Sequence, residues 1–206
     1  MMPKWIPGQK DNKPVYLGTL AFAISGALAA ARKQFDLFGG IFLGFVTAIG
    51  GGTLRDMMLN IPVAWLHDIW YFYIVVFAVG FTFVCRNYIE KYSKTLFLFD
   101  TIGISVFTII GMQKGLALDI HPILSVMMGI LTAVFGGIVR DMMCVDIPLI
   151  FRKEIYATAC LIGGCAYLLL NWLACPDFIS IVVASLVIFV VRTVSVIKNW
   201  SLPRFK

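Results

Sequence analysis

Two nearly identical stretches contain the residues of this chain that are best suited to chemistry. The first runs from Gly50 to Met58 (GGGTLRDMM) and the second from Phe135 to Met143 (FGGIVRDMM), each at the far end of an apolar run. Charged side chains inside a membrane are costly, so those that occur there are candidates for function. The Arg-Asp pairs are predicted to be fixed charges or a gate beside a pathway, or else ion pairs that clamp two halves of the protein together. These residues are Arg55, Asp56, Arg140 and Asp141.

The glycines of both stretches predict irregular backbone. A glycine costs about 1 kcal/mol relative to alanine in a helix interior, so consecutive glycines favour a break. A break exposes carbonyl oxygens at the negative end of a half-helix, and both features favour a cation. We therefore predict a cation pathway or a small-ligand site, with a structural kink that lets helices cross as the alternative. The predicted pathway residues are Gly50, Gly51, Gly52, Gly136, Gly137, Thr47 and Thr132.

Spacing also suggests partners for the charged residues. Adjacent residues on a helix point about 100° apart, so the two members of each Arg-Asp pair are predicted to be poor partners for each other. Each arginine is expected to bind a carboxylate elsewhere, such as Asp68, Glu154 or the aspartate of the other stretch. Asp100 is expected to cap a helix N-terminus, with attraction of a cation as the alternative. Arg192 is expected to extend to the cytoplasmic interface.

The composition indicates a membrane protein. Of the 206 residues, 60% are hydrophobic and 14% are charged, whereas a soluble domain averages about 25% charged residues. The basic residues lie in short tails and loops, which predicts helix orientation and no nucleic-acid binding. The motifs G-x-S-x-G and H-E-x-x-H and the P-loop do not occur. We therefore predict no enzyme activity, no catalytic residue, no cofactor and no metal beyond a permeating cation.

Seven apolar runs predict seven transmembrane helices, because about 20 apolar residues cross the hydrocarbon core at 1.5 Å per residue. The runs are 15–31, 37–54, 69–85, 96–112, 122–139, 155–173 and 178–197. The predicted fold class is therefore an all-α membrane protein whose second and fifth helices are broken at the glycines. We divide the chain into a polar tail (1–14), a first three-helix repeat (15–90), a second (91–176), a seventh helix (177–197) and a basic tail (198–206).

The two halves of the chain are copies of each other. Matching residues lie 85 positions apart, including Gly18 with Gly103, Phe22 with Phe107, Gly26 with Gly111, Gly44 with Gly129, Gly51 with Gly136 and Arg55 with Arg140. Because each copy has three helices, the second is predicted to enter the membrane from the opposite side. Such inverted repeats point to a transport site where the two copies meet.

The distribution of Lys and Arg predicts the orientation. Five of these residues fall on the side of the N-terminus and twelve on the other side. Cytoplasmic loops carry the excess of positive charge, so the C-terminus is predicted to be cytoplasmic and the N-terminus outside. The predicted location is a prokaryotic inner membrane.

The doubled motif, the proline that follows each copy (Pro62 and Pro148) and the extra seventh helix resemble the prokaryotic trimeric intracellular cation (TRIC) channel family. The same sequence family includes bacterial proteins described as glycine transporters. The resemblance covers nearly the whole chain, from Val15 to Ile197. This sequence departs from the pattern at Phe135, which replaces the first glycine of the second copy, so a tighter break is expected there.

The resemblance implies a function that the residues alone do not give. It implies a homotrimer with a pore in each protomer, lined by the kinked second and fifth helices, that passes potassium and also sodium with weak discrimination. It also implies bound phospholipid in the trimer. The alternative is a secondary transporter of glycine or a similar small zwitterion, and a third class is a membrane scaffold without transport.

Overall fold

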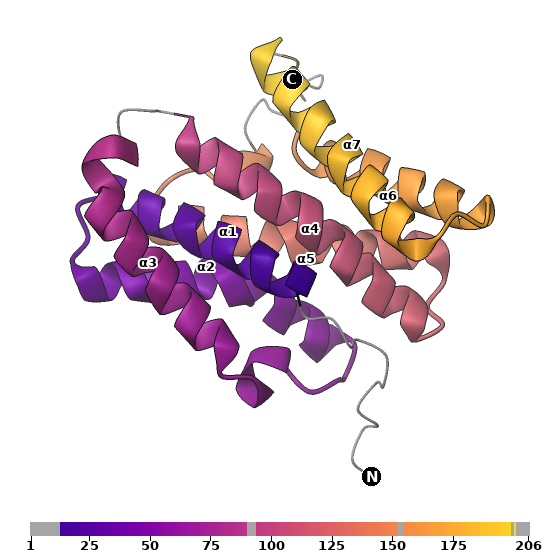
Figure 1. The fold of residues 1–206 in the computed structure, drawn as a ribbon, viewed down its shortest axis with the longest axis horizontal. Helices are drawn as coiled ribbons and strands as arrows, with labels where there is room; N and C mark the ends of the chain where they lie inside the picture. The colour runs from indigo at the N-terminus through magenta and orange to yellow at the C-terminus, as the bar shows by residue number, and fades with distance from the viewer. Residues whose placement is uncertain (1–12, 90–93, 152–154, 199, 201–206) are drawn as a thin grey trace.

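The computed structural model describes residues 13–89, 94–151, 155–198 and 200 (Figure 1). Within these ranges the protein consists of seven α-helices and two short 3-10 helices, and no strand occurs there. The α-helices are α1 (Lys13–Arg32), α2 (Leu37–Met58), α3 (Trp70–Ile89), α4 (Thr95–Ala117), α5 (Pro122–Met143), α6 (Ala157–Trp172) and α7 (Asp177–Ile197). The 3-10 helices are η1 (Ala64–His67) and η2 (Leu149–Phe151). Each of the seven predicted apolar runs corresponds to one α-helix.

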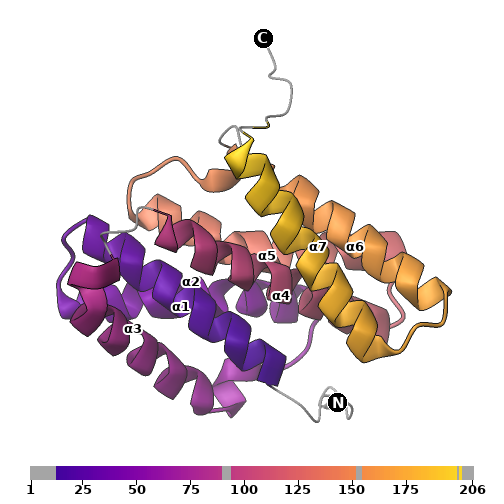
Figure 2. The same ribbon diagram turned by 45° about the horizontal axis from the view of Figure 1, so that its top comes forward.

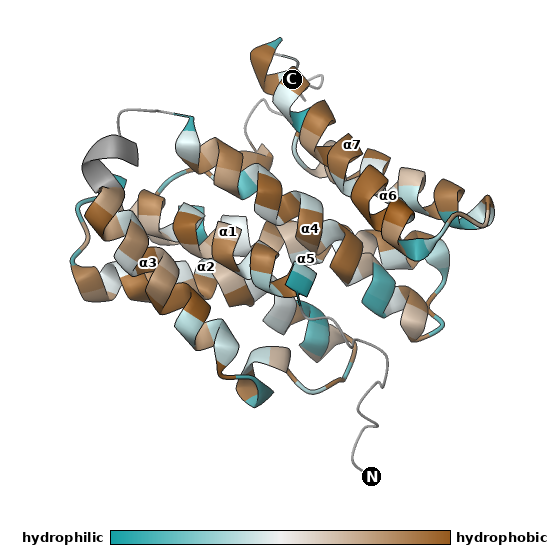
Figure 3. Ribbon diagram, in the orientation of Figure 1, coloured by the Kyte–Doolittle hydropathy of each residue, from teal (hydrophilic) through white to brown (hydrophobic). Residues whose placement is uncertain are grey.

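The surface of the bundle is suited to lipid. Five helices (α1, α2, α4, α5 and α7) are long and apolar enough to cross a membrane, and the apolar parts of α3 and α6 are shorter. Large apolar side chains are exposed along the outer helices α3 and α7, where Figure 3 shows mostly hydrophobic residues. A soluble monomer rarely exposes continuous apolar surface on this scale. The all-α membrane fold with seven helices is therefore confirmed.

The four helices α1, α2, α4 and α5 form the centre of the bundle. Helix α1 packs against α4, and α2 packs against α5, so that the two halves of the chain meet along both pairs. Helix α3 covers α1 and α2, while α6 and α7 lie together beside α4, as Figures 1 and 2 show from two directions. The predicted boundary between the repeats, at residues 90 and 91, lies outside the described residues.

Helices α2 and α5 continue as α-helices through the glycines, so the expected break that would free backbone carbonyls is not found. No glycine among the described residues has a positive φ angle. The helix propensity of glycine is unfavourable by only about 1 kcal/mol per residue, and tertiary packing outweighs such a term. The glycines therefore serve close contact between helices.

Phenylalanine and glycine make a reciprocal contact where α1 meets α4. A Cβ atom on Gly18 would lie 2.9 Å from the ring of Phe107, and one on Gly103 would lie 2.3 Å from the ring of Phe22. The two rings stack on each other with centroids 5.3 Å apart. Because each ring occupies the space above the glycine of the other repeat, the contact is symmetric and supports the predicted duplication.

The turns after α2 and α5 are also equivalent, but their residues are not equally suited to them. Asn60 and Val145 both have left-handed backbone, with φ angles of 52° and 55°. Asparagine tolerates this conformation, whereas a β-branched residue rarely adopts it. The Val145 side chain is 92% exposed, so no packing compensates for its backbone.

Val145→Asn is expected to raise the free energy of unfolding by about 1 kcal/mol, because left-handed backbone costs an ordinary residue roughly that much or more. The measurement is the melting temperature of the detergent-purified protein. The reverse exchange in the other repeat, Asn60→Val, should lower it by a similar amount. Equal melting temperatures for both variants and the parent would contradict this account.

Candidate ion pathway and charge clusters

Helices α2 and α5 cross with their backbones in direct contact. A Cβ atom on Gly51 would lie 1.9 Å from the carbonyl oxygen of Thr132, and one on Gly136 would lie 2.3 Å from the carbonyl oxygen of Thr47. Real Cβ atoms do not approach backbone this closely, so only glycine permits the crossing. The crossing therefore brings together four of the seven predicted pathway residues in a symmetric arrangement, with each glycine facing the threonine of the other repeat.

The two threonines of the crossing use their hydroxyl groups within their own helices. Thr47 Oγ1 donates to the Leu43 carbonyl at 2.6 Å, and Thr132 Oγ1 donates to the Met128 carbonyl at 2.6 Å. Both side chains are buried. In the conformation described here the crossing is closed, because backbone atoms occupy the space between the helices.

The other three predicted pathway residues lie beside the crossing. A Cβ atom on Gly50 would reach only the Phe135 ring, at 4.0 Å, and one on Gly52 would reach only the Arg55 guanidinium, at 3.6 Å. Gly137 lies under the Tyr156 hydroxyl, which a Cβ atom would approach to 2.8 Å. Gly52 and Gly137 therefore connect the crossing to two separate clusters of buried charge.

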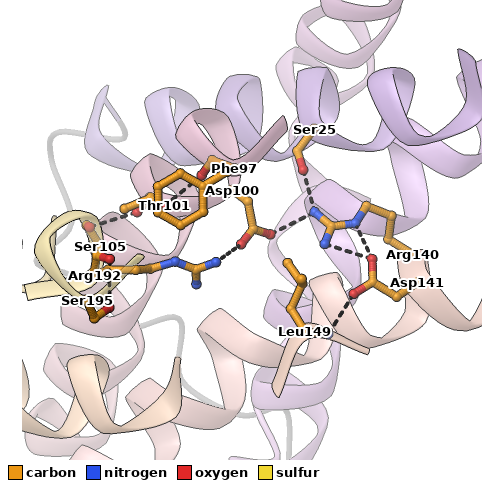
Figure 4. Close-up of polar contacts among 10 residues, drawn as sticks. All are labelled: Ser25, Phe97, Asp100, Thr101, Ser105, Arg140, Asp141, Leu149, Arg192 and Ser195. Atoms are coloured by element: carbon orange, nitrogen blue, oxygen red, sulfur yellow. Dashed lines mark hydrogen bonds and ion pairs between the residues drawn. The ribbon is translucent and has the colours of Figure 1, made fainter. Parts of the chain in front are cut away.

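The cluster of the second repeat is centred on Asp100 (Figure 4). Its Oδ1 atom lies 2.7 Å from Arg140 Nη1, and its Oδ2 atom lies 2.9 Å from Arg192 Nη2, so one carboxylate from α4 bridges arginines of α5 and α7. Arg140 also pairs with Asp141 at 2.8 Å and donates to the hydroxyl of Ser25 on α1. The Arg192 guanidinium lies 4.0 Å from the centre of the Tyr156 ring, a cation–π contact.

The cluster of the first repeat is built differently around the equivalent Arg-Asp pair. Arg55 Nη2 lies 2.7 Å from Asp56 Oδ1, and Lys114 of α4 reaches the same oxygen at 3.1 Å. Arg55 and Asp56 are almost fully buried, while Lys114 is partly exposed. Two cations thus share one carboxylate oxygen in this cluster.

The second carboxylate oxygen of each aspartate has a structural task. Asp56 Oδ2 accepts from the backbone nitrogen of Ala64 at 3.1 Å, and Asp141 Oδ2 accepts from the backbone nitrogen of Leu149 at 3.0 Å. Ala64 begins η1 and Leu149 begins η2, so each aspartate ties the connection after its helix back to the helix end. These equivalent bonds give Asp56 and Asp141 a role in shaping the fold.

Three expectations about the charges prove wrong. Arg55 and Arg140 do bind the adjacent aspartates, because a long guanidinium stem can fold back along its helix to the neighbouring carboxylate. Asp100 lies inside α4, away from its N-terminus, and is fully buried. Arg192 is fully buried and pairs with Asp100, so it does not extend to the interface. Arg140 does also bind a carboxylate elsewhere in the chain, Asp100, as expected. Of the partners named for the arginines, Glu154 lies outside the described residues and Asp68 binds the Tyr16 hydroxyl. Each motif aspartate pairs with the arginine of its own stretch.

Three charged members of the clusters were not among the predicted site residues: Lys114, Arg192 and Asp100. A signal existed for Asp100, since its repeat partner is the apolar Val15 and a charge without a counterpart marks a departure from symmetry. Lys114 and Arg192 also lack a charged counterpart. The repeat partner of Lys114 is Ala29, and Arg192 lies on the seventh helix, which has no partner in the first repeat. Departures from the repeat therefore identify the charges that make each cluster distinct.

Comparison with known proteins identifies the family of this chain. The family described as "Glycine transporter" matches residues 15–87 and 97–172. The chain belongs to this family. A similar protein, the UPF0126 inner membrane protein YadS of Escherichia coli (strain K12), is 43% identical over 150 residues, which is 72% of each chain.

Solved structures connect the glycine transporter family to the TRIC channels. The TRIC trimeric intracellular cation channel orthologue from Rhodobacter sphaeroides is 33% identical, with a TM-score of 0.86 over 90% of this chain and 96% of that one. A second TRIC cation channel structure is 35% identical, with a TM-score of 0.82 over 96% and 98% of the two chains. The resemblance drawn from the doubled motif is therefore confirmed, and these matches are channels and membrane proteins rather than enzymes.

Proposed function

We propose that this chain forms a channel for monovalent cations, potassium and also sodium, in a prokaryotic inner membrane. The observation that carries the proposal is the likeness to TRIC cation channels along nearly the whole chain, with TM-scores of 0.82 and 0.86. Identity of 33% and 35% accompanies this likeness, so it extends beyond the general arrangement of helices.

The proposed pathway passes the crossing of α2 and α5 in each protomer. Ions would move when the two helices separate and uncover the carbonyl oxygens of Thr47 and Thr132, which now touch Gly136 and Gly51. Carbonyl and hydroxyl oxygens replace part of the hydration shell of a cation. The neighbouring Gly50, Gly52 and Gly137 would give the helices room to move. The Arg-Asp pairs would shape the field at both ends of the path or hold it closed: Arg55, Asp56, Arg140 and Asp141.

The proposal extends to the assembly and its surroundings. We propose a homotrimer with bound phospholipid, in keeping with the trimeric relative from Rhodobacter sphaeroides. We also propose two three-helix repeats (15–90 and 91–176) followed by the seventh helix (177–197), with the N-terminus outside and the C-terminus in the cytoplasm. Reporter enzymes fused to each terminus test the orientation, and activity of a periplasmic reporter at the C-terminus would contradict it.

Conduction is tested by single-channel recording of the purified protein in planar bilayers with a potassium gradient. We expect discrete current steps that reverse near the potassium equilibrium potential. Replacing the crossing hydroxyls in Thr47→Val/Thr132→Val should lower the unitary conductance about fivefold, because a lost polar contact is worth about 1 kcal/mol. Thr82→Val is the matched control, since Thr82 on α3 is buried and donates to the Ala78 carbonyl at 2.8 Å. Bilayers without current steps would contradict the channel.

A secondary transporter of glycine is the second candidate, favoured by the description of the matching family. Its test is uptake of labelled glycine into proteoliposomes. Saturable uptake by a protein that produces no current steps in the bilayer would establish a carrier and replace the channel proposal.

A further inference from the structure

The two charge clusters differ by one carboxylate. In the second repeat the carboxylate of Asp100 lies between two arginines, 2.7 Å from Arg140 and 2.9 Å from Arg192. The equivalent position in the first repeat, 85 residues earlier on α1, is Val15. The reciprocal contacts of Phe22 and Phe107 show that α1 and α4 occupy equivalent places in the two repeats. The first cluster therefore has an apolar residue where the second has a carboxylate.

Arg55 has a donor that this difference leaves unused. The Arg55 side chain is only 4% exposed, so water has little access to it. Its buried Nη1 atom has no hydrogen-bond partner among the described residues. The same atom of Arg140 binds both Asp100 Oδ1 and the hydroxyl of Ser25. The residue equivalent to Ser25 is Ile110, so Arg55 lacks both partners. A buried charged donor without a partner carries a large desolvation penalty.

A cavity of about 20 Å³ adjoins this donor. Its walls include Val15, Gly52, Arg55 and Tyr71, with Trp65 and Phe107 beside them. Asp56 also lines the cavity, but both of its carboxylate oxygens already have partners, in Arg55, Lys114 and the Ala64 backbone nitrogen. In the second repeat the Tyr156 hydroxyl and Asp100 Oδ1 lie 2.8 and 3.5 Å from the Cβ position of Gly137. At the equivalent Gly52 only the Arg55 guanidinium comes within 4 Å of that position. The space that a carboxylate fills in one repeat is therefore open in the other, and it is large enough for at least one water-sized group.

The charge balance of the clusters differs in the same sense. Two arginines and two aspartates make the second cluster neutral. In the first cluster Arg55 and Lys114 share the single carboxylate of Asp56, which leaves one positive charge in excess. Asp68 lies nearby but binds the Tyr16 hydroxyl at 2.5 Å and the Trp70 backbone nitrogen at 3.0 Å, and it does not line the cavity. One bound carboxylate would balance the charge.

We propose that the cavity of the first repeat is a binding site for a small carboxylate, held by Arg55 Nη1 as Asp100 is held by Arg140. The carboxylate of Asp100 is the internal template for this ligand. Formate is the smallest carboxylate and is therefore the probe for so small a space. The site adjoins the proposed cation path at Gly52 and Arg55, and its test measures binding and not current.

The experiment compares the melting temperature of the detergent-purified protein in potassium formate and in potassium chloride at equal concentration. Formate is expected to raise the melting temperature of the parent protein above its value in chloride. Val15→Asp places a tethered carboxylate in the cavity, as in the second repeat. This variant should be at least as stable as Val15→Asn, which has the same shape without the charge. Its apparent affinity for formate should fall at least about tenfold, since the site is already occupied.

Each result decides the proposal. A formate shift in the parent protein that disappears in Val15→Asp and persists in Val15→Asn supports a carboxylate site at this cavity. Equal melting temperatures of the parent in formate and chloride would overturn it. A shift that survives in Val15→Asp would place the ligand elsewhere. A lower stability of Val15→Asp than of Val15→Asn would show that the cavity does not favour negative charge.

Discussion

Asp100→Asn is expected to lower the free energy of unfolding by about 3–5 kcal/mol, the usual cost of removing one partner from a buried ion pair. The substitution keeps the shape of the side chain but leaves two buried arginines with one carboxylate, that of Asp141, which contacts Arg140. Arg192 then has no carboxylate partner among the described residues. Both arginines and Asp100 are fully buried, so water cannot compensate for the lost charge. The measurement is the melting temperature of the detergent-purified protein.

The matched control is a carboxylate in an exposed pair. Asp146 lies 2.8 Å from Lys33, but both side chains are more than a third exposed, and such pairs contribute about 0–1 kcal/mol. Asp146→Asn should therefore have little effect. Adding Arg192→Met to Asp100→Asn should recover part of the lost stability, because it removes the excess positive charge. An Asp100→Asn protein as stable as the Asp146→Asn control would refute the role of the bridge.

Gly51→Ala should be far more harmful than alanine at the adjacent glycine. The new Cβ atom would lie 1.9 Å from the Thr132 carbonyl oxygen, so α2 and α5 must move apart. We expect a loss of about 3 kcal/mol or more in the free energy of unfolding, because this overpacking is against rigid backbone. Gly136→Ala should lower the free energy of unfolding by a similar amount, since its Cβ atom would lie 2.3 Å from the Thr47 carbonyl oxygen.

Gly50→Ala is the control for this prediction. It lies on the same turn of α2, but its Cβ atom would meet only the Phe135 ring at 4.0 Å. The helix propensity of alanine should then stabilise α2 by up to about 1 kcal/mol. Melting temperatures in detergent separate the two substitutions. Similar values for Gly50→Ala and Gly51→Ala would mean that the close approach of α2 and α5 does not govern stability.

The glycine motif predicts part of the structure correctly and part of it wrongly. Its recurrence and its apolar surroundings correctly indicate a duplicated membrane fold, and the small residues correctly mark where helices approach. The predicted break does not occur, because a propensity of about 1 kcal/mol per glycine is small beside the packing of two helices. Whether these residues line an ion pathway depends on a conformation in which the crossing opens, and recording from the Thr47→Val/Thr132→Val protein tests that point.

The sequence by itself determined the seven helices, the duplication and the family, because apolar runs and an 85-residue repeat are properties of the chain alone. Only the tertiary structure decided which charges bind each other. Asp100, Arg140 and Arg192 lie on α4, α5 and α7, and their contact depends on how those helices pack rather than on their spacing. The same is true of Val15 and Arg55 at the cavity of the first repeat. Partners far apart in the chain are chosen by burial and geometry, since a buried charge must find its counterpart wherever the fold brings one near.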